Sequence, residues 1–166
     1  MNHSILDSKI EMVNEIAGKF QGALSSVVVE YRGLTVSEVT QLRRLLRAEG
    51  IEFKVYKNSM VQRAVEDVGY GTLIESLTGP NAFAFGSDAV APSRILTKFA
   101  KKHKMLVVKG GVVEGKVVDA DTIKILSDLP GREGMIATLL GCLQSPIRDF
   151  AYAIKQIAEK QEVAQQ

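Results

Sequence analysis

Short apolar strands alternate with helical segments through the first 130 residues, and this alternation constrains the fold more than any other feature. Strands are predicted over residues 24–30, 51–56, 82–85 and 105–118, the last broken by glycines. Helices are predicted over 6–20, 35–50, 58–69, a segment beginning near 91, and 120–129. Strand–helix units that repeat in this way favour an α/β fold with a mainly parallel or mixed sheet and helices packed on it, with α+β as the alternative.

The predicted helices carry explicit end signals. Thr35 and Glu38 form the capping-box pattern, in which each side chain satisfies a backbone amide of the first turn. Gly50 and Gly69 then stand where a left-handed residue commonly ends a helix. These signals set the helix boundaries without reference to the rest of the chain.

The last part of the chain, from residue 131 to residue 166, follows a different pattern. Its large apolar residues recur at steps of four and three: Ile136, Leu140, Leu143, Ile147, Phe150, Ile154 and Ile157. This is a heptad-type stripe, and it lies beyond a segment that can already form one core. We therefore expect one domain over residues 1–130 and a separate amphipathic helix over 131–166. Pro146 falls inside that helix, so a kink or break is expected there.

Composition excludes several classes of protein. The chain has 166 residues, 46% hydrophobic and 24% charged, which is typical of a globular protein. No apolar run approaches the roughly 18 residues of a membrane-spanning helix, so no membrane is expected. The single Cys142 cannot form an internal disulfide, which favours a cytoplasmic location. With one cysteine and two histidines, a metal site of the usual Cys/His type is not expected.

One segment, "GGVVEGKV" at residues 110–117, nearly matches the phosphate-binding loop of nucleotide-binding proteins. Val117 stands where that loop needs a hydroxyl for magnesium, and the segment continues as a strand instead of a helix. A glycine-containing hairpin or bulge is the better interpretation. No nucleophile, paired acids or reactive cysteine indicate catalysis, and Cys142 lies among leucines as an apolar filler. The sequence therefore predicts neither a cofactor nor an enzyme.

Basic, aromatic and polar residues gather where two of the predicted strands end. They are Arg32 and Gly33 after the first strand, and Lys54, Tyr56, Lys57 and Asn58 around the end of the second. Because one crossover helix joins these strands, we expect them to be parallel and to end at the same edge of the sheet. Two helix N-termini with unpaired amides flank that edge, and the combination suits the phosphates of a folded nucleic acid.

Some of these residues have a second interpretation. Tyr56 either stacks on a base or covers the neighbouring helix, and Asn58 can cap its helix in either case. Arg63 belongs to a basic stretch over residues 31–63, and a second basic run, "KFAKKHK", covers 98–104. Such runs are also typical of solvated helix faces, and His103 within the second run is expected at the surface.

Several segments in order resemble one family over essentially the whole chain. They are "EYRGLTVSEVTQLRRLLR", "KVYKNSMVQRAV", "LTGPNAFAF", "KFAKKHK", "VKGGVVEGKV" and "LLGCLQSPIRDFAYAI". Together they are similar to the bacterial stalk-base proteins of the large ribosomal subunit, ribosomal protein ten. One departure is Gly131, where the family usually has a serine, so the side chain that would cap the start of the last helix is absent.

The resemblance implies a structural constituent of the large ribosomal subunit, in the cytoplasm on the ribosome. The first domain is expected on large-subunit ribosomal RNA beside ribosomal protein eleven. The residues expected at the RNA are Arg32, Gly33, Lys54, Tyr56, Lys57, Asn58 and Arg63. The C-terminal helix is expected to collect dimers of the acidic stalk protein, which recruit translation GTPases.

The apolar stripe is then expected to be completed by another chain, in the manner of a helix in a groove. The residues expected to bind stalk-protein dimers follow Pro146: Ile147, Phe150, Ala151, Ile154, Ile157 and Ala158. About 20 residues follow that proline, and we expect them to hold two dimers. Two alternatives stay open on the residues alone: a self-assembling protein whose tail forms a homodimeric coiled coil, and an enzyme of unrecognised type.

Overall fold

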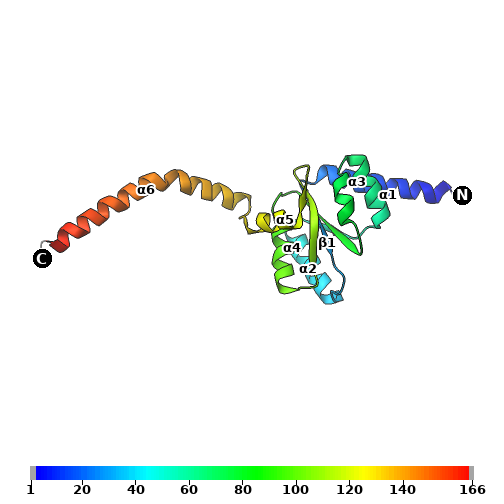
Figure 1. Ribbon diagram of the computed structural model, residues 1–166, viewed down its shortest axis with the longest axis horizontal. Helices are drawn as coiled ribbons and strands as arrows, with labels where there is room; N and C mark the ends of the chain where they lie inside the picture. Colours follow the sequence, from blue (N-terminus) through cyan, green and yellow to red (C-terminus); the bar gives the residue numbers. More distant parts are fainter. Residues whose placement is uncertain (1–2, 165–166) are drawn as a thin grey trace. The chain divides into compact units, whose positions relative to one another are not determined.

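The computed structural model describes the backbone of residues 3–164, and the side chains of residues 7–131 and 133–157. The chain divides into two compact units, Met1–Leu129 and Pro130–Gln166 (Figure 1). The first unit contains α1 (His3–Gly22), β1 (Ser25–Glu30), α2 (Val36–Ala48), β2 (Glu52–Lys54), α3 (Asn58–Val68), a 3-10 helix η1 (Gly71–Ser76), β3 (Asn81–Gly86), α4 (Ala91–Lys102), β4 (Val107–Val113), β5 (Lys116–Asp119) and α5 (Ala120–Asp128). The second unit consists mainly of α6 (Arg132–Ala164). Within the described range, no helix is long and apolar enough to cross a membrane.

The five strands form one sheet in the order β2-β3-β1-β4-β5, and every neighbouring pair is antiparallel. The protein is therefore an α+β protein, and the prediction of a mainly parallel or mixed sheet is wrong. The helix α2 connects β1 to β2, but these two strands are not neighbours in the sheet, because one strand position lies between them. β3 later fills that position in the opposite direction. The periodicity of strands and helices does not predict that β3 inserts between β1 and β2. The insertion depends on which strands pair, and these strands are far apart in the sequence.

Helices cover both faces of the sheet, and the central strand β1 is buried almost throughout. Alternate residues of β1 point to opposite faces, as the period of two requires. One core cluster contains Val27, Val29, Leu42, Leu46, Leu96 and Ile123, and joins β1 to α2, α4 and α5. The other contains Ile16, Phe20, Val28, Val61, Val65 and Phe83, and joins β1 and β3 to α1 and α3.

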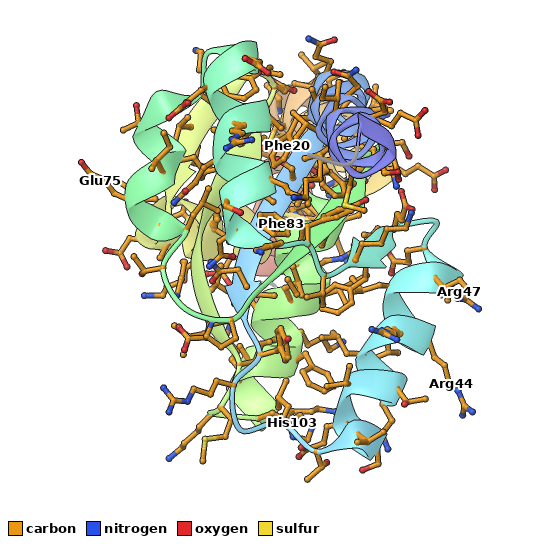
Figure 2. All side chains as sticks on the ribbon, turned by 90° about the vertical axis from the view of Figure 1, so that its right-hand side faces the viewer. Phe20, Arg44, Arg47, Glu75, Phe83 and His103 are labelled. Carbon is orange, nitrogen blue, oxygen red and sulfur yellow. The ribbon has the colours of Figure 1, made fainter. Side chains whose placement is uncertain are left out.

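An aromatic pair lies at the centre of the second cluster. Phe20 and Phe83 meet edge to face, with their ring centroids 6.3 Å apart (Figure 2). Fully burying an aromatic side chain stabilises a fold by roughly 1.5–3 kcal/mol. Phe20 lies near the C-terminal end of α1, so α1 is attached to the sheet mainly by its C-terminal half. In that half, Ile16 and Phe20 are buried, whereas Ile10 in the preceding turns is exposed.

The segment at residues 110–117 is a β-hairpin, as the sequence predicted. Val113 pairs with Lys116, so the loop consists of Glu114 and Gly115, with φ angles of 50° and 77°. Two consecutive positive φ angles are the requirement of a type I′ turn, which matches the twist of the strands. A register shift occurs opposite Val28 and Val29 of β1, where β4 carries its glycine pair.

The helix ends also follow the predicted signals. The backbone amide of Thr35 donates to Oε2 of Glu38 at 2.7 Å, and Oγ1 of Thr35 accepts from the amide of Glu38, so the capping box is confirmed. At the other end of α2, Gly50 has a φ of 71°, and the amide of Ile51 donates to the carbonyl of Leu46 at 2.9 Å. This is a Schellman ending, which a glycine makes possible.

Of the kink or break expected at Pro146, the break is wrong, because the helix α6 is continuous through that residue. Figure 1 shows one curved helix from Arg132 to Ala164. Proline removes one backbone donor, and a helix can absorb that loss by bending. At its start, the carbonyl of Gly131 accepts from the amide of Met135 at 2.9 Å. Gly131 thus occupies the capping position without a side chain to satisfy the first amides.

Candidate nucleic-acid interface

β1 and β2 finish at the same end of the sheet. Each pairs antiparallel with β3, so the two strands run in the same direction although β3 lies between them. Their predicted common direction is therefore confirmed, and the loops that follow them leave at one end. We call this the basic end and define it by Arg32 and Gly33 after β1 and by Lys57 and Asn58 after β2.

The loop after β1 is exposed and tightly turned. Arg32 is exposed, and Gly33 has a φ of 91°. A Cβ atom at Gly33 would lie 3.3 Å from Sδ of Met105, which precedes β4. Lys104 lines the same shallow pocket as Arg32, so one lysine of the 98–104 run joins the basic end.

The loop after β2 presents three of the predicted residues in different ways. Lys57 is exposed and precedes α3. Asn58 does not cap the helix: its Nδ2 donates to the carbonyl of Gly79 at 2.7 Å. Arg63 is exposed further along α3 and lines a groove with Lys9 of α1 and Lys57. None of Arg32, Lys57, Arg63 and Lys104 forms an ion pair with another side chain that the structure describes.

Lys54 and Tyr56 instead face α1. Nζ of Lys54 lies 3.0 Å from Glu52 and 3.3 Å from Glu15, so two carboxylates already balance its charge. The Tyr56 hydroxyl accepts from Nζ of Lys19 at 3.1 Å, and its ring packs against Phe83 with centroids 6.2 Å apart. Of its two predicted roles, this arrangement corresponds to covering the neighbouring helix.

The network around Lys54 perturbs the titration of its members. Hydrogen bonds from Lys19 and then Lys54 hold the pKa of Glu15 and that of Glu52 below the ordinary value. Burial lowers the pKa of Lys19, but hydrogen bonds to Glu52, Glu15 and Tyr56 outweigh that effect and raise it. The network therefore ties α1 to β2 most firmly when both carboxylates are ionised.

This arrangement predicts a loss of stability in acid. Carboxylates with a depressed folded pKa contribute stability above their ordinary value of 4.5 and lose it as the pH falls through the folded value. Replacing Glu15 and Glu52 together with glutamine should lower stability near neutral pH and reduce the further loss on acidification. Urea unfolding at about pH 7 and about pH 3 measures both effects. The control Glu75→Gln, at an exposed position of η1, should behave as wild type; an identical acid loss in the double variant would contradict the prediction.

Two further contacts between polar side chains were not predicted from the sequence. His103, expected at the surface, is half-buried: its ring stacks on Phe99 with centroids 4.3 Å apart, and Nδ1 lies 2.8 Å from Oε1 of Glu38. Lys109 of β4 pairs with Glu30 at 2.6 Å, and its Nζ also donates to the carbonyl of Thr78. No local pattern identifies these pairs, because 65 and 79 residues separate the partners along the chain.

The second unit presents its apolar stripe to solvent. The exposed fractions are 74% for Ile147, 68% for Phe150, 51% for Ile154 and 58% for Ile157. Ala151 is also exposed, whereas the side chain of Ala158 lies outside the described residues. No metal-binding group of three histidine, cysteine or acidic side chains occurs among the residues that the structure describes. Cys142 is free and exposed on the same helix.

A domain with unpaired basic loops at one end of its sheet, and a separate helix with an exposed apolar stripe, define a scaffold-type binding protein. Comparison with known proteins identifies the family. Residues 4–101 match the model of ribosomal protein L10, and residues 129–164 match the ribosomal protein uL10 C-terminal region. The chain belongs to the ribosomal protein L10 family, the stalk-base proteins of the large ribosomal subunit, and it is not an enzyme.

Relatives match along nearly the whole chain. The large ribosomal subunit protein uL10 of Oceanobacillus iheyensis is 55% identical over 159 residues, which cover 95% of this chain and 96% of the relative. The proteins of the same name from Bacillus cereus strain B4264 and Bacillus anthracis strain A0248 are each 50% identical over the same length.

Proposed function

We propose that the first unit anchors the chain to large-subunit ribosomal RNA and that α6 tethers dimers of the acidic stalk protein. The RNA site lies beside ribosomal protein eleven, and the tethered dimers recruit translation GTPases. The observation that carries this proposal is the exposed stripe of α6 in a chain whose first unit closes its own core. An apolar surface of this kind is typical of a binding site for another protein.

The basic end supports the RNA half of the proposal. Arg32, Lys57, Arg63 and Lys104 keep their charges free of acidic partners in the described structure, so they can contact phosphates without breaking an ion pair. Gly33 gives the loop its left-handed turn and makes room for the side chain of Met105 beside Arg32. Asn58 supports the site through Gly79, and Lys54 and Tyr56 hold β2 against α1 below it.

The stripe supports the other half. Ile147, Phe150, Ala151, Ile154 and Ile157 recur at helical spacing on α6, and Ala158 continues that spacing. A helix of this type binds by placing its apolar face in the groove of a partner. The length of α6 after Pro146 suits two dimers bound one after the other.

Salt dependence tests the RNA half. Replacing Arg32 and Lys57 together with alanine should weaken binding to purified large-subunit ribosomal RNA. It should also reduce the slope of log K against log salt by about 1.5, because each lost phosphate contact removes roughly 0.7–0.9. Filter binding over a range of salt concentrations measures the slope.

The matched control changes the same number of charges elsewhere. Arg44 and Arg47 are exposed on α2, and Figure 2 shows both directed away from the domain. Their double alanine variant should keep the wild-type slope. A slope that falls equally in both variants, or in neither, places the RNA contact away from the basic end.

A further inference from the structure

The antiparallel topology places a turn between the two basic loops. Because β3 lies between β1 and β2, the turn that leads into β3, Thr78–Gly79–Pro80, stands between Arg32 and Lys57 at the basic end. We propose that this turn is itself a contact for the RNA backbone, and that Lys109, Asn58 and Asn81 position it. The inference rests on the proposed RNA function. A strand of RNA that reaches both basic loops has to pass over the turn.

Two side chains hold the turn from opposite sides. Nζ of Lys109, from β4, donates to the carbonyl of Thr78, and Nδ2 of Asn58 donates to the carbonyl of Gly79 at 2.7 Å. Glu30 fixes Lys109 in turn, with an ion pair of 2.6 Å. The carbonyl oxygens of Thr78 and Gly79 are thus engaged by donors, which removes two groups that would otherwise repel a phosphate.

The outer surface of the turn is small and open. Thr78 and Gly79 are exposed, and Gly79 has a φ of 78°, a conformation that glycine adopts without strain. A Cβ atom at Gly79 would lie 3.6 Å from Nζ of Lys109 and 3.7 Å from Oε1 of Glu30, so the glycine lets the turn lie directly against this ion pair. The Thr78 hydroxyl, which makes no hydrogen bond with a described residue, can donate to a phosphate or a ribose hydroxyl.

A buried amide behind the turn is a second, independent observation. Asn81 is 1% exposed, and neither its Nδ2 nor its Oδ1 has a hydrogen-bond partner among the described residues. It lies on the same face of β3 as Phe83 and Phe85, where an apolar residue would pack without an unpaired polar group. Both atoms are closed to solvent, so the amide does not touch the RNA itself; it acts on the turn through the adjoining Pro80–Asn81 backbone or through a bridging water.

The test uses the full chain and purified large-subunit ribosomal RNA. Thr78→Glu places a negative charge on the turn and should weaken binding by about tenfold or more, because like charges meet at the interface. Thr72→Glu is the matched control, because Thr72 is exposed on η1. The residue before η1, Tyr70, has its hydroxyl near the hairpin residue Gly115, which lies at the other end of the sheet. The control should bind as wild type, and both variants should keep the wild-type melting temperature.

A second variant separates positioning from stability. Asn81→Leu removes a buried unpaired amide, so its melting temperature should equal or exceed that of wild type while its RNA affinity falls. A purely structural role for Asn81 would leave the affinity unchanged.

The Arg32 and Lys57 double variant, titrated in parallel, tells the two proposals apart. If it binds weakly while Thr78→Glu and Asn81→Leu bind as wild type, the turn is not a contact and the inference is overturned. If all three bind as wild type, the proposed RNA site itself is wrong.

Discussion

Replacing Phe150 and Ile154 together with alanine is expected to remove the acidic stalk-protein dimers from the distal part of α6. The two side chains are 68% and 51% exposed in the isolated chain and lie one helical turn apart. Truncating a large apolar side chain at a site that becomes buried costs about 2–5 kcal/mol. Two such losses lower the affinity by roughly a thousandfold or more, since each 1.4 kcal/mol is a factor of ten. Native mass spectrometry of the complex counts the dimers that remain.

The control for this experiment lies on the same helix. Tyr152 is 59% exposed but does not belong to the stripe, so Tyr152→Ala should keep every dimer. Binding of the double variant to ribosomal RNA should be unchanged, because the basic end belongs to the other unit. Full occupancy in the double variant would show that the stripe serves another contact. Light scattering that finds a stable homodimer of the isolated wild-type chain would favour the coiled-coil alternative.

The second large effect is expected at Gly111. A Cβ atom there would lie 2.3 Å from the carbonyl oxygen of Ser26 and 3.1 Å from Cα of Val27, both in the backbone of the central strand. Neither strand can move aside, because β1 is paired on both of its edges. Gly111→Ala should therefore destabilise the first unit by about 3 kcal/mol or more and lower its melting temperature by about 10 °C.

A glycine in open surroundings gives the matched control. An added Cβ at Gly18 in α1 meets nothing within 4 Å. Gly18→Ala should raise stability by about 0.5–1 kcal/mol, because alanine favours a helix over glycine. Calorimetry on both variants gives the comparison. A melting temperature for Gly111→Ala equal to that of wild type would contradict the close packing of β4 on β1.

The secondary structure could be predicted from the sequence because its signals are local. Thr35 and Glu38 cap α2 through contacts within one turn, and Glu114 and Gly115 form the hairpin loop through their own backbone angles. The order of the strands could not be predicted in this way. β3 enters between β1 and β2 through pairings such as Glu30 with Asn81, which no local pattern specifies.

The residues of the candidate site also differ in whether local sequence signals predict their positions. Arg32 and Lys57 follow directly from the strand ends, and the structure places both at the basic end. Lys54 looks equally available in the sequence, but its charge is balanced by Glu15, which lies on α1 at a distance of 39 residues along the chain. Lys109 offered no signal, because its role depends on Thr78 and Glu30 being brought beside it by the sheet.

The central position of β1 has a consequence for the synthesis of the chain. β1 is made early, but its two partners occupy residues 81–86 and 107–113 and are made much later. Translation adds about 5–20 residues per second, so the middle strand spends several seconds with both edges unpaired. Amphipathic helices made in the meantime can cover the faces of β1, but they cannot pair with the backbone N–H and C=O groups along its edges. Those groups stay available to other chains. A translational pause before residue 86 would lengthen that interval and favour aggregation of the nascent chain.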